Sequence, residues 1–364
     1  MRTARDHWSR NVQLLTFSVT DKCPARCAHC LAGSGPSETA MLAADEMIRI
    51  YHEAKEYGGA DVVVFTGGEP TLLGDALLDV IATVSLAGAL TRIVTNAWWA
   101  EDEASAKATI RQLREAGLDE INFSMDDYHA VWVPVENVAR AYRAARGVGF
   151  SAVVLALANS VNSRITPDWI HQNIDPDIPV VAQELSVRSA GPSPEADGTV
   201  YEISSHGYSR VGRARHLKDR LVETDPLLSR VQYSCQEVMN TVVVDAHGNV
   251  GACCGLRTQG NPILTLGNAR SSEFGQLMDA GFGDVIIQAL HALGPKYLLD
   301  LARRVDETVE IRPGYSHVCE ICEDLTLNPA AVAALKLMEP TIVAEVQARR
   351  REGTSGTAFP VWNG

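Results

Sequence analysis

The chain has 364 residues, of which 46% are apolar and 21% are charged, a balance that is usual for a folded protein with one large domain and a smaller one. Its formal net charge of −13 argues against nucleic acid as a partner, because surfaces that bind nucleic acid are normally basic. No apolar run approaches the roughly 18 residues of a membrane span, and the polar segment Met1–Gln13 is unlike a secretory signal, so we expect a cytoplasmic protein with no membrane partner.

The first half of the chain alternates short apolar runs with longer amphipathic ones. The runs typical of strands are Leu14–Thr20, Asp61–Thr66, Thr91–Thr95, Glu120–Ser124, Ser151–Ala158 and Val180–Val187. The helical patterns are Ala43–Tyr57, Leu72–Leu86, Glu103–Ala116, Val135–Arg146 and Pro167–Gln172. Strands that alternate with helices predict parallel βαβ units, which build either an open doubly wound sheet or a partial barrel. In both architectures ligands bind at the C-terminal ends of the strands.

The second half has a different pattern. Residues 189–209 are rich in Gly, Pro and Ser and predict a long connection. The elements expected after it are a hairpin of Thr241–Asp245 and Asn249–Cys253, helices at Ser272–Leu293 and Lys296–Arg304, a loop with two cysteines, and a final helix from Pro329. Asn328 is the expected N-cap of that last helix, and Pro340 is expected to kink or end it.

Three cysteines follow the first strand in a C-x3-C-x2-C loop: Cys23, Cys27 and Cys30. Thiolates are the usual ligands of iron–sulfur clusters, and three of them leave one corner of a 4Fe–4S cube without a protein ligand. An open position on a metal is typical of a catalytic site. The alternative is a zinc site completed by a distant fourth ligand. Gly67, Asn96 and Asp126 stand at the ends of the next three strands, where ligands bind.

The sequence Gly67-Gly68-Glu69-Pro70 lies at the end of the second predicted strand. Together with the three cysteines it resembles the radical S-adenosylmethionine (SAM) superfamily, whose GGEP motif contacts the SAM amino group. The resemblance implies a partial (β/α)6 barrel. It also implies that His29, Asn96, Ser124 and Asp126 contact SAM. Asn96 is followed by Ala97 where many relatives have glycine.

By that resemblance, SAM binds the open iron and is cleaved by one electron, and the resulting 5′-deoxyadenosyl radical takes a hydrogen atom from the substrate. The cofactor performs this chemistry, and the protein orients it and excludes water. A low-potential electron donor of the flavodoxin or ferredoxin type is therefore an expected partner.

A second set of cysteines comprises Cys235, Cys253, Cys254, Cys319 and Cys322. Cys235, Gly248 and Cys253 fit the C-x(9–15)-G-x4-C pattern of SPASM and twitch extensions in radical SAM proteins, and no cysteine follows Cys322. The extension thus resembles the shorter α+β twitch type, also found in aminocyclitol dehydrogenases. The resemblance implies an auxiliary 4Fe–4S cluster on Cys235, Cys253, Cys319 and Cys322 that transfers electrons. A four-cysteine zinc site is the alternative, and Cys254 could replace Cys253 as ligand.

These assignments divide the chain into a radical SAM core (10–188), a linker (189–230), a twitch-like domain (231–352) and a flexible tail (353–364). Asp126 and His129, after the fourth strand, and Glu184, at the end of the sixth, are the candidates for contact with the substrate or for proton transfer. The plain alternatives are a capped turn for the first two residues and an ion pair with Arg188 for Glu184. The segment Val211–Arg215 resembles a Gly-Arg-Ala element of relatives, or is only a turn.

The expected substrate is a small natural product of the sugar or cyclitol kind. The first strand begins near Leu14, which leaves no room for the N-terminal peptide-recognition domain of many peptide maturases. The alternatives are a short peptide that is cross-linked or epimerised, and a non-catalytic protein that binds zinc or a cluster.

Overall fold

The computed structural model describes residues 12–184, 187–188, 192–207, 209–218, 221–222 and 234–353. Its strands form one sheet in the order β11-β10-β9-β1-β2-β3-β4-β5-β8-β6-β7. The parallel part of this sheet runs through β1 (Leu14–Ser18), β2 (Val62–Thr66), β3 (Leu90–Thr95), β4 (Glu120–Ser124), β5 (Ala152–Asn159), β8 (Val200–Gly207) and β6 (Val180–Glu184). The short β7 (Val187–Arg188) pairs antiparallel with β6.

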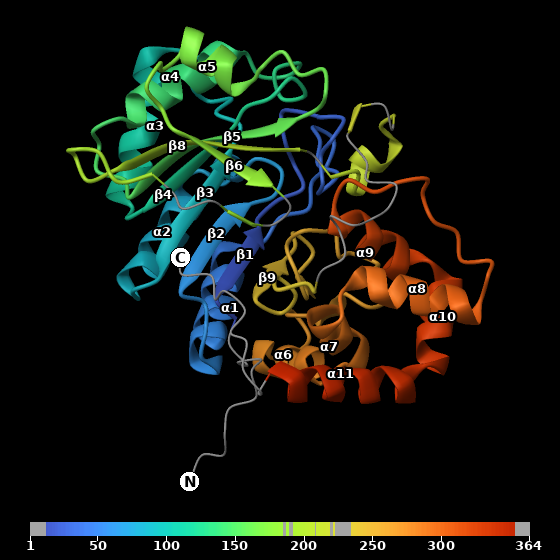
Figure 1. Ribbon diagram of the computed structural model, residues 1–364. Helices are drawn as coiled ribbons and strands as arrows, with labels where there is room; N and C mark the ends of the chain where they lie inside the picture. The colour runs from blue at the N-terminus through green and yellow to red at the C-terminus, as the bar shows by residue number, and fades with distance from the viewer. Residues whose placement is uncertain are drawn as a thin grey trace.

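The helices between these strands cover one face of the sheet, on the left and at the top of Figure 1. They are α1 (Ala44–Tyr57), the short 3-10 helix η1 (Pro70–Leu73), α2 (Asp75–Leu86), α3 (Glu103–Glu115), α4 (Val135–Ala145) and α5 (Pro167–Asn173). Because β1 to β5 are neighbours in chain order with no reversal, right-handed crossovers place their helices on the same face. That order is the one of a barrel, whereas a doubly wound sheet reverses, so the predicted partial barrel is confirmed.

Side chains alternate between the two faces of this sheet. Those on the helix-covered face form the main core, among them Leu15, Phe17, Val63, Phe65, Ile93, Ile121, Phe123, Val153, Leu155, Tyr201 and Ile203. The other face lines the inside of the curved sheet. One level of it carries Ser18, Thr66, Asn122 and Glu202, as the strand registers show. The inner face is thus polar just below the strand ends.

The sixth place in the barrel is taken by β8 and not by the predicted strand at Val180–Val187. β8 lies between β5 and β6 and pairs in parallel with both. The segment that forms β8 was expected to be part of a linker, because it contains serine, histidine and glycine and lacks a β-branched run. Tertiary pairing on both sides stabilises it as a strand despite this weak local preference.

The hairpin of the second half extends the sheet at its other edge. β9 (Thr241–Val244) runs parallel to β1, β10 (Asn249–Gly251) is antiparallel to β9, and β11 (Thr265–Asn268), which was not predicted, is antiparallel to β10. The sheet therefore continues across the predicted domain boundary. The division into domains stays a prediction, and the predicted tail from residue 354 onwards lies outside the described residues.

The remaining helices gather beside β9, on the right of Figure 1. They are α6 (Phe274–Gly283), α7 (Val285–Ala292), α8 (Pro295–Val305), α9 (Val318–Leu327), α10 (Pro329–Leu337) and α11 (Glu339–Gly353). Asp284 interrupts the single helix expected at Ser272–Leu293, because its carboxylate caps the amides of Ile286 and Ile287. No helix in the described part of the chain is both long and apolar enough to cross a bilayer.

The helices α9 and α10 agree with one expectation and differ from another. Asn328 caps α10 as predicted, with its side chain accepting from Ala330 and Ala331, and the helix breaks before Pro340. The pair Cys319 and Cys322, however, lies in the first turns of α9 and not in a loop. The ring of His317 accepts a hydrogen bond from the Cys319 amide and so caps this helix, a role that histidine rarely signals in a sequence.

Candidate active site

The first three cysteines lie at the C-terminal end of β1 and face one another. Cys23 and Cys27 are 7% and 5% exposed and pack together, with Cys30 and Tyr128 against them. The amide of Ala25 and the side-chain amide of Asn96 both donate to the Cys23 sulfur at 3.4 Å. Burial raises the pKa of Cys23 to about 12, so this thiol needs positive charge beside it to be a thiolate. Three thiols that pack together, two of them buried and one with donors to its sulfur, fit an iron–sulfur cluster.

The two glycines after β2 pack against the backbone of the cysteine loop. Gly67 has a φ of +123°, and a Cβ on it would stand 2.6 Å from the carbonyl oxygen of Thr20. A Cβ on Gly68 would stand 2.0 Å from the carbonyl oxygen of Lys22. Two backbone hydrogen bonds join this turn to the cysteine loop, one from Gly68 N to Thr20 O and one from Glu69 N to Lys22 O. The glycines therefore bring the cysteine loop and the GGEP segment into direct contact.

Glu69 joins the ends of β2 and β3. Its fully buried carboxylate accepts from Thr71 N and Oγ1, from Thr95 Oγ1 at 2.8 Å and from Asn96 N at 2.9 Å. Burial raises the pKa of Glu69, and these donors oppose that rise. The side chain of Glu69 thus organises the strand ends, which leaves the backbone of the Gly67–Pro70 turn to face a ligand.

Asn96 is followed by an alanine in the left-handed conformation. Ala97 has a φ of +57°, a left-handed conformation that glycine adopts without strain and alanine at a cost of roughly 1–2 kcal/mol. The backbone of the common Asn-Gly turn is therefore kept although the glycine is not. Asn96 holds this turn by accepting from Trp98 N at 3.0 Å, while its amide reaches Cys23.

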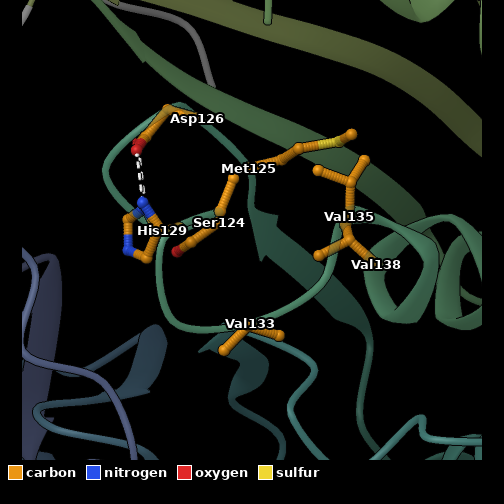
Figure 2. Close-up of a pocket in the computed structure, with 8 residues that line it drawn as sticks. Ser124, Met125, Asp126, His129, Val133, Val135 and Val138 are labelled. Atoms are coloured by element: carbon orange, nitrogen blue, oxygen red, sulfur yellow. Dashed lines mark hydrogen bonds and ion pairs between the residues drawn. The ribbon is translucent and has the colours of Figure 1, made fainter.

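The turn after β4 brings two imidazoles onto one carboxylate. Asp126 is 1% exposed; its Oδ2 lies 3.1 Å from His29 Nε2 and 2.8 Å from His129 Nδ1. Its Oδ1 accepts from the amides of Tyr128 and His129, both at 2.9 Å. Figure 2 shows Asp126 and His129 pointing toward each other, with Ser124 beside them and Met125 on the far side of the turn.

Burial alone would raise the pKa of Asp126, but His129 and His29 together hold it below its ordinary value, so this carboxylate is ionised at neutral pH. Both of its oxygens are occupied by protein donors. The expected capped turn is present, and the Asp126 carboxylate holds the rings of His29 and His129. His29 stacks on Tyr128 at 4.7 Å, and its Nδ1 is buried with no hydrogen-bond partner among the described residues.

Replacing Asp126 by asparagine is expected to weaken the apo-protein by about 1–3 kcal/mol at pH 7, because an amide cannot accept all the donors of the buried carboxylate. The folded pKa of Asp126 lies below the unfolded one, so its contribution is present above pH ~4 and is lost as the pH falls further. Urea denaturation of both proteins at pH 7 and near pH 3 tests this. An equal difference at the two pH values would contradict it.

The second set of cysteines meets between β10 and α9. Burial raises the pKa of Cys253, Cys319 and Cys322, and the nearby Cys235 raises each of them further. The chain passes so close here that a Cβ on Gly255 would stand 3.3 Å from the Cys319 sulfur. The structure thus gathers the thiols that sequence reasoning assigned to one auxiliary site.

Cys253 and Cys254 have different surroundings. The sulfur of Cys253 accepts from the amides of Gly255 and Leu256, as that of Cys235 does from Glu237 and Val238. Hydrogen bonds from the backbone to sulfur are typical of cysteines that hold iron–sulfur clusters. The thiol of Cys254 instead donates to Thr241 Oγ1 at 3.5 Å.

The predicted residues do not all converge. The residues at the ends of β1 to β4 meet around the first cysteines. Glu184 ends β6, on the far side of β8, and its side chain and that of Arg188 lie outside the described part of the structure.

Sequence reasoning missed two features of the site. One is the polar inner face with Asn122 and Glu202, which strict alternation in β4 and β8 could have shown. The other is Arg213, whose guanidinium lies against the cysteine loop and which only a Gly-Arg-Ala segment signals.

Comparisons with known proteins agree on the first half of the chain. Residues 17–162 match the family model described as Radical SAM superfamily. The chain is 34% identical over 176 residues to a GTP 3',8-cyclase of Mycobacterium sp. (strain KMS), covering 47% of this chain and 46% of that protein. It is 32% identical over 165 residues to a GTP 3',8-cyclase of Synechococcus elongatus, covering 44% and 46%. The chain spans about half the length of these curated relatives.

Among solved structures, the chain is similar to BtrN in complex with AdoMet and 2-DOIA, with a TM-score of 0.47 and 15% identity, over 78% of this chain and 89% of that one. It is also similar to anSMEcpe with bound AdoMet and Cp18Cys peptide, with a TM-score of 0.47 and 13% identity, over 93% and 99%. Similarity of this degree does not carry an activity from one protein to another.

Proposed function

Because residues 17–162 are a radical SAM domain, we propose that this chain is an enzyme that cleaves SAM reductively and removes a hydrogen atom from its substrate. The observation that carries the proposal is the contact between two segments: the buried Cys23–Cys30 loop and the Gly67–Pro70 turn, which pack backbone against backbone. When bound, a 4Fe–4S cluster and SAM supply the electron transfer and the 5′-deoxyadenosyl radical.

In this proposal the residues around the loop bind and orient SAM. The carbonyl groups of the Gly67–Pro70 turn accept from the SAM amino group. The rings of His29 and Tyr128, stacked at 4.7 Å, offer an aromatic face for the adenine. Asp126 is a positioning residue here, since it holds His29 and His129 and its oxygens have no capacity left for the ribose.

The second group of thiols supports an auxiliary cluster that passes electrons. Four thiolates, those of Cys235, Cys253, Cys319 and Cys322, would close a cube completely and leave no site for substrate. A low-potential flavodoxin or ferredoxin would supply the first electron. An electron donor of either type is consistent with a cytoplasmic enzyme.

The matched pair Cys253→Ala and Cys254→Ala tests the ligand assignment. We expect Cys253→Ala to lose about four irons per chain, the content of one cube. Cys254→Ala should keep its iron, because the thiol of Cys254 donates to the hydroxyl of Thr241 at 3.5 Å. Iron and sulfide are counted after anaerobic reconstitution. The reverse pattern would make Cys254 the ligand, and full iron in both variants would remove the auxiliary site from this position.

The polar inner face supports a small hydroxylated substrate of the sugar or cyclitol kind. Asn122 and Glu202 lie at one level of the barrel with Ser18 and Thr66, which end β1 and β2, and with Val94 and Val154. Asn122 lies two residues before the end of β4 and Glu202 five residues before the end of β8. The Oδ1 of Asn122 is buried with no partner among the described residues, so a ligand hydroxyl could donate to it. A short peptide, and the GTP of the curated relatives, are the alternatives.

The experiment that tests the function is anaerobic reconstitution followed by an assay for 5′-deoxyadenosine with SAM and dithionite. About eight irons per chain and 5′-deoxyadenosine formation support the proposal. Deuterated cyclitols, peptides and GTP are then compared by deuterium transfer into 5′-deoxyadenosine. Stoichiometric zinc with no SAM cleavage would favour the non-catalytic alternative.

A further inference from the structure

The segment Arg210–Arg215, which we call the strap, crosses the first cysteine loop from the side. The backbone amide of Arg213 donates to the carbonyl oxygen of Cys30 at 3.1 Å. Its guanidinium donates to the carbonyl oxygen of Cys27 at 3.1 Å and to that of Ser34. Gly212, with a φ of +56°, makes this approach possible, because a Cβ there would stand 2.3 Å from the carbonyl oxygen of Leu31. The strap therefore holds the loop at both of its later cysteines.

The strap is in turn fixed to the helix that carries Cys319 and Cys322. The carboxylate of Glu320, which is 0% exposed, accepts a hydrogen bond from the backbone amide of Arg210 at 2.7 Å and another from the Arg210 guanidinium at 2.9 Å. Glu323 accepts from the amide of Gly212 at 2.8 Å and pairs with Arg215 at 2.8 Å. Glu320 and Glu323, which make these contacts, alternate along α9 with Cys319 and Cys322.

Further donors complete this network of charges. Arg312 binds Glu323 at 3.1 Å and Asp324 at 2.9 Å, and also donates to the carbonyl oxygen of Arg210 at 2.7 Å. Arg215 binds Asp324 at 2.9 Å. The three carboxylates are at most 7% exposed, and each has a guanidinium partner. Buried charges that are all paired favour one geometry, because breaking a pair leaves an uncompensated charge in the interior.

We propose that the strap positions the first cluster loop relative to α9, and that Arg213 places a fixed positive charge against this loop. The proposal rests on the proposed function for its cluster, and it adds a mechanical and electrostatic link between the two cysteine sets. The guanidinium of Arg213 contacts the carbonyl oxygen of Cys27, so its charge lies beside the cysteine loop. A cation near an anionic cluster favours the reduced, more negative state and so raises the reduction potential.

Three variants separate the parts of this proposal. Arg213→Gln removes both the charge and the two-pronged contact. Arg213→Lys keeps the charge and loses that contact. Arg215→Gln leaves the loop contacts intact and removes one of the strap's contacts with α9, while Arg210–Glu320 and Gly212–Glu323 remain and Glu323 and Asp324 keep Arg312 as a partner. Arg270→Gln, which removes a guanidinium from a surface pair with Glu46, is the matched control.

The first measurement is hydrogen–deuterium exchange of residues 27–36 in the apo-protein, followed by mass spectrometry. We expect faster exchange in all three strap variants and unchanged exchange in the control. Because Arg215 does not touch the loop, a change in Arg215→Gln can reach it only through the strap. Unchanged exchange in Arg215→Gln would overturn the role of Arg215 in the link to α9, and unchanged exchange in Arg213→Gln would overturn the positioning role.

The second measurement is an EPR-monitored redox titration of the reconstituted proteins. Arg213→Gln is expected to shift the potential of the SAM-binding cluster to more negative values, and Arg213→Lys to shift it less. Equal potentials in wild type and Arg213→Gln would overturn the electrostatic role. If the wild type forms no cluster whose EPR signal changes with SAM, the proposed function fails instead, and the exchange data still decide the positioning role.

Discussion

Replacing Cys27 by alanine is expected to abolish formation of 5′-deoxyadenosine and to lower the iron content from about eight to about four per chain. Cys27 is one of three thiols on the loop, so its loss leaves two ligands for a cube. Losing an outer-shell partner of a metal already costs roughly 10–100-fold in affinity or activity, and losing a ligand costs more. Iron counting and a SAM-cleavage assay on the reconstituted variant measure both effects.

The four irons that remain serve as the internal control for Cys27→Ala. They belong to the second cysteine set, whose thiols lie between β10 and α9 and do not contact Cys27. Alanine removes only a sulfur from a residue that is 5% exposed, so the protein should still fold. SAM cleavage at the wild-type rate by this variant would refute the assignment of the first cluster.

Replacing Gly68 by alanine is expected to disrupt the same site without touching a cysteine. The new Cβ would stand 2.0 Å from the carbonyl oxygen of Lys22, which is backbone and cannot move aside cheaply. The GGEP turn or the cysteine loop must shift, and the hydrogen bonds from Gly68 N and Glu69 N to that loop are strained or lost. A displacement of about 1 Å can cost ~100-fold in rate. We therefore expect SAM cleavage to fall by about 100-fold or more.

Gly283→Ala is the matched control for Gly68→Ala. Gly283 ends α6, and nothing lies within 4 Å of the position where its Cβ would be. This variant should keep wild-type cleavage and gain up to about 1 kcal/mol, because alanine is favoured over glycine in helices. Equal cleavage in Gly68→Ala and the wild type would show that the two segments need not touch for the chemistry.

Local patterns predicted most of the barrel because its elements are determined over short stretches of chain. Val62–Thr66 is a β-branched run that ends at two glycines, and α1 begins and ends where the amphipathic pattern does. β8 escaped prediction because its stability comes from pairing with β5 and β6 on both sides. Cys319 and Cys322 were placed in a loop because the histidine cap of α9 has no strong signal.

The sequence by itself predicted the chemistry that is proposed for this protein. Three cysteines at a fixed spacing and a GGEP turn, each at a strand end, are enough to predict a cluster site, because parallel strands bring their C-terminal ends to one edge. Only the tertiary structure decided what each side chain does there. Glu69 and Asp126 were expected to contact SAM, and in the structure protein donors bind both carboxylates. Arg213 reaches the carbonyl oxygen of Cys27 from 186 residues away, and a contact between such distant positions depends on the folded backbone and leaves no local pattern.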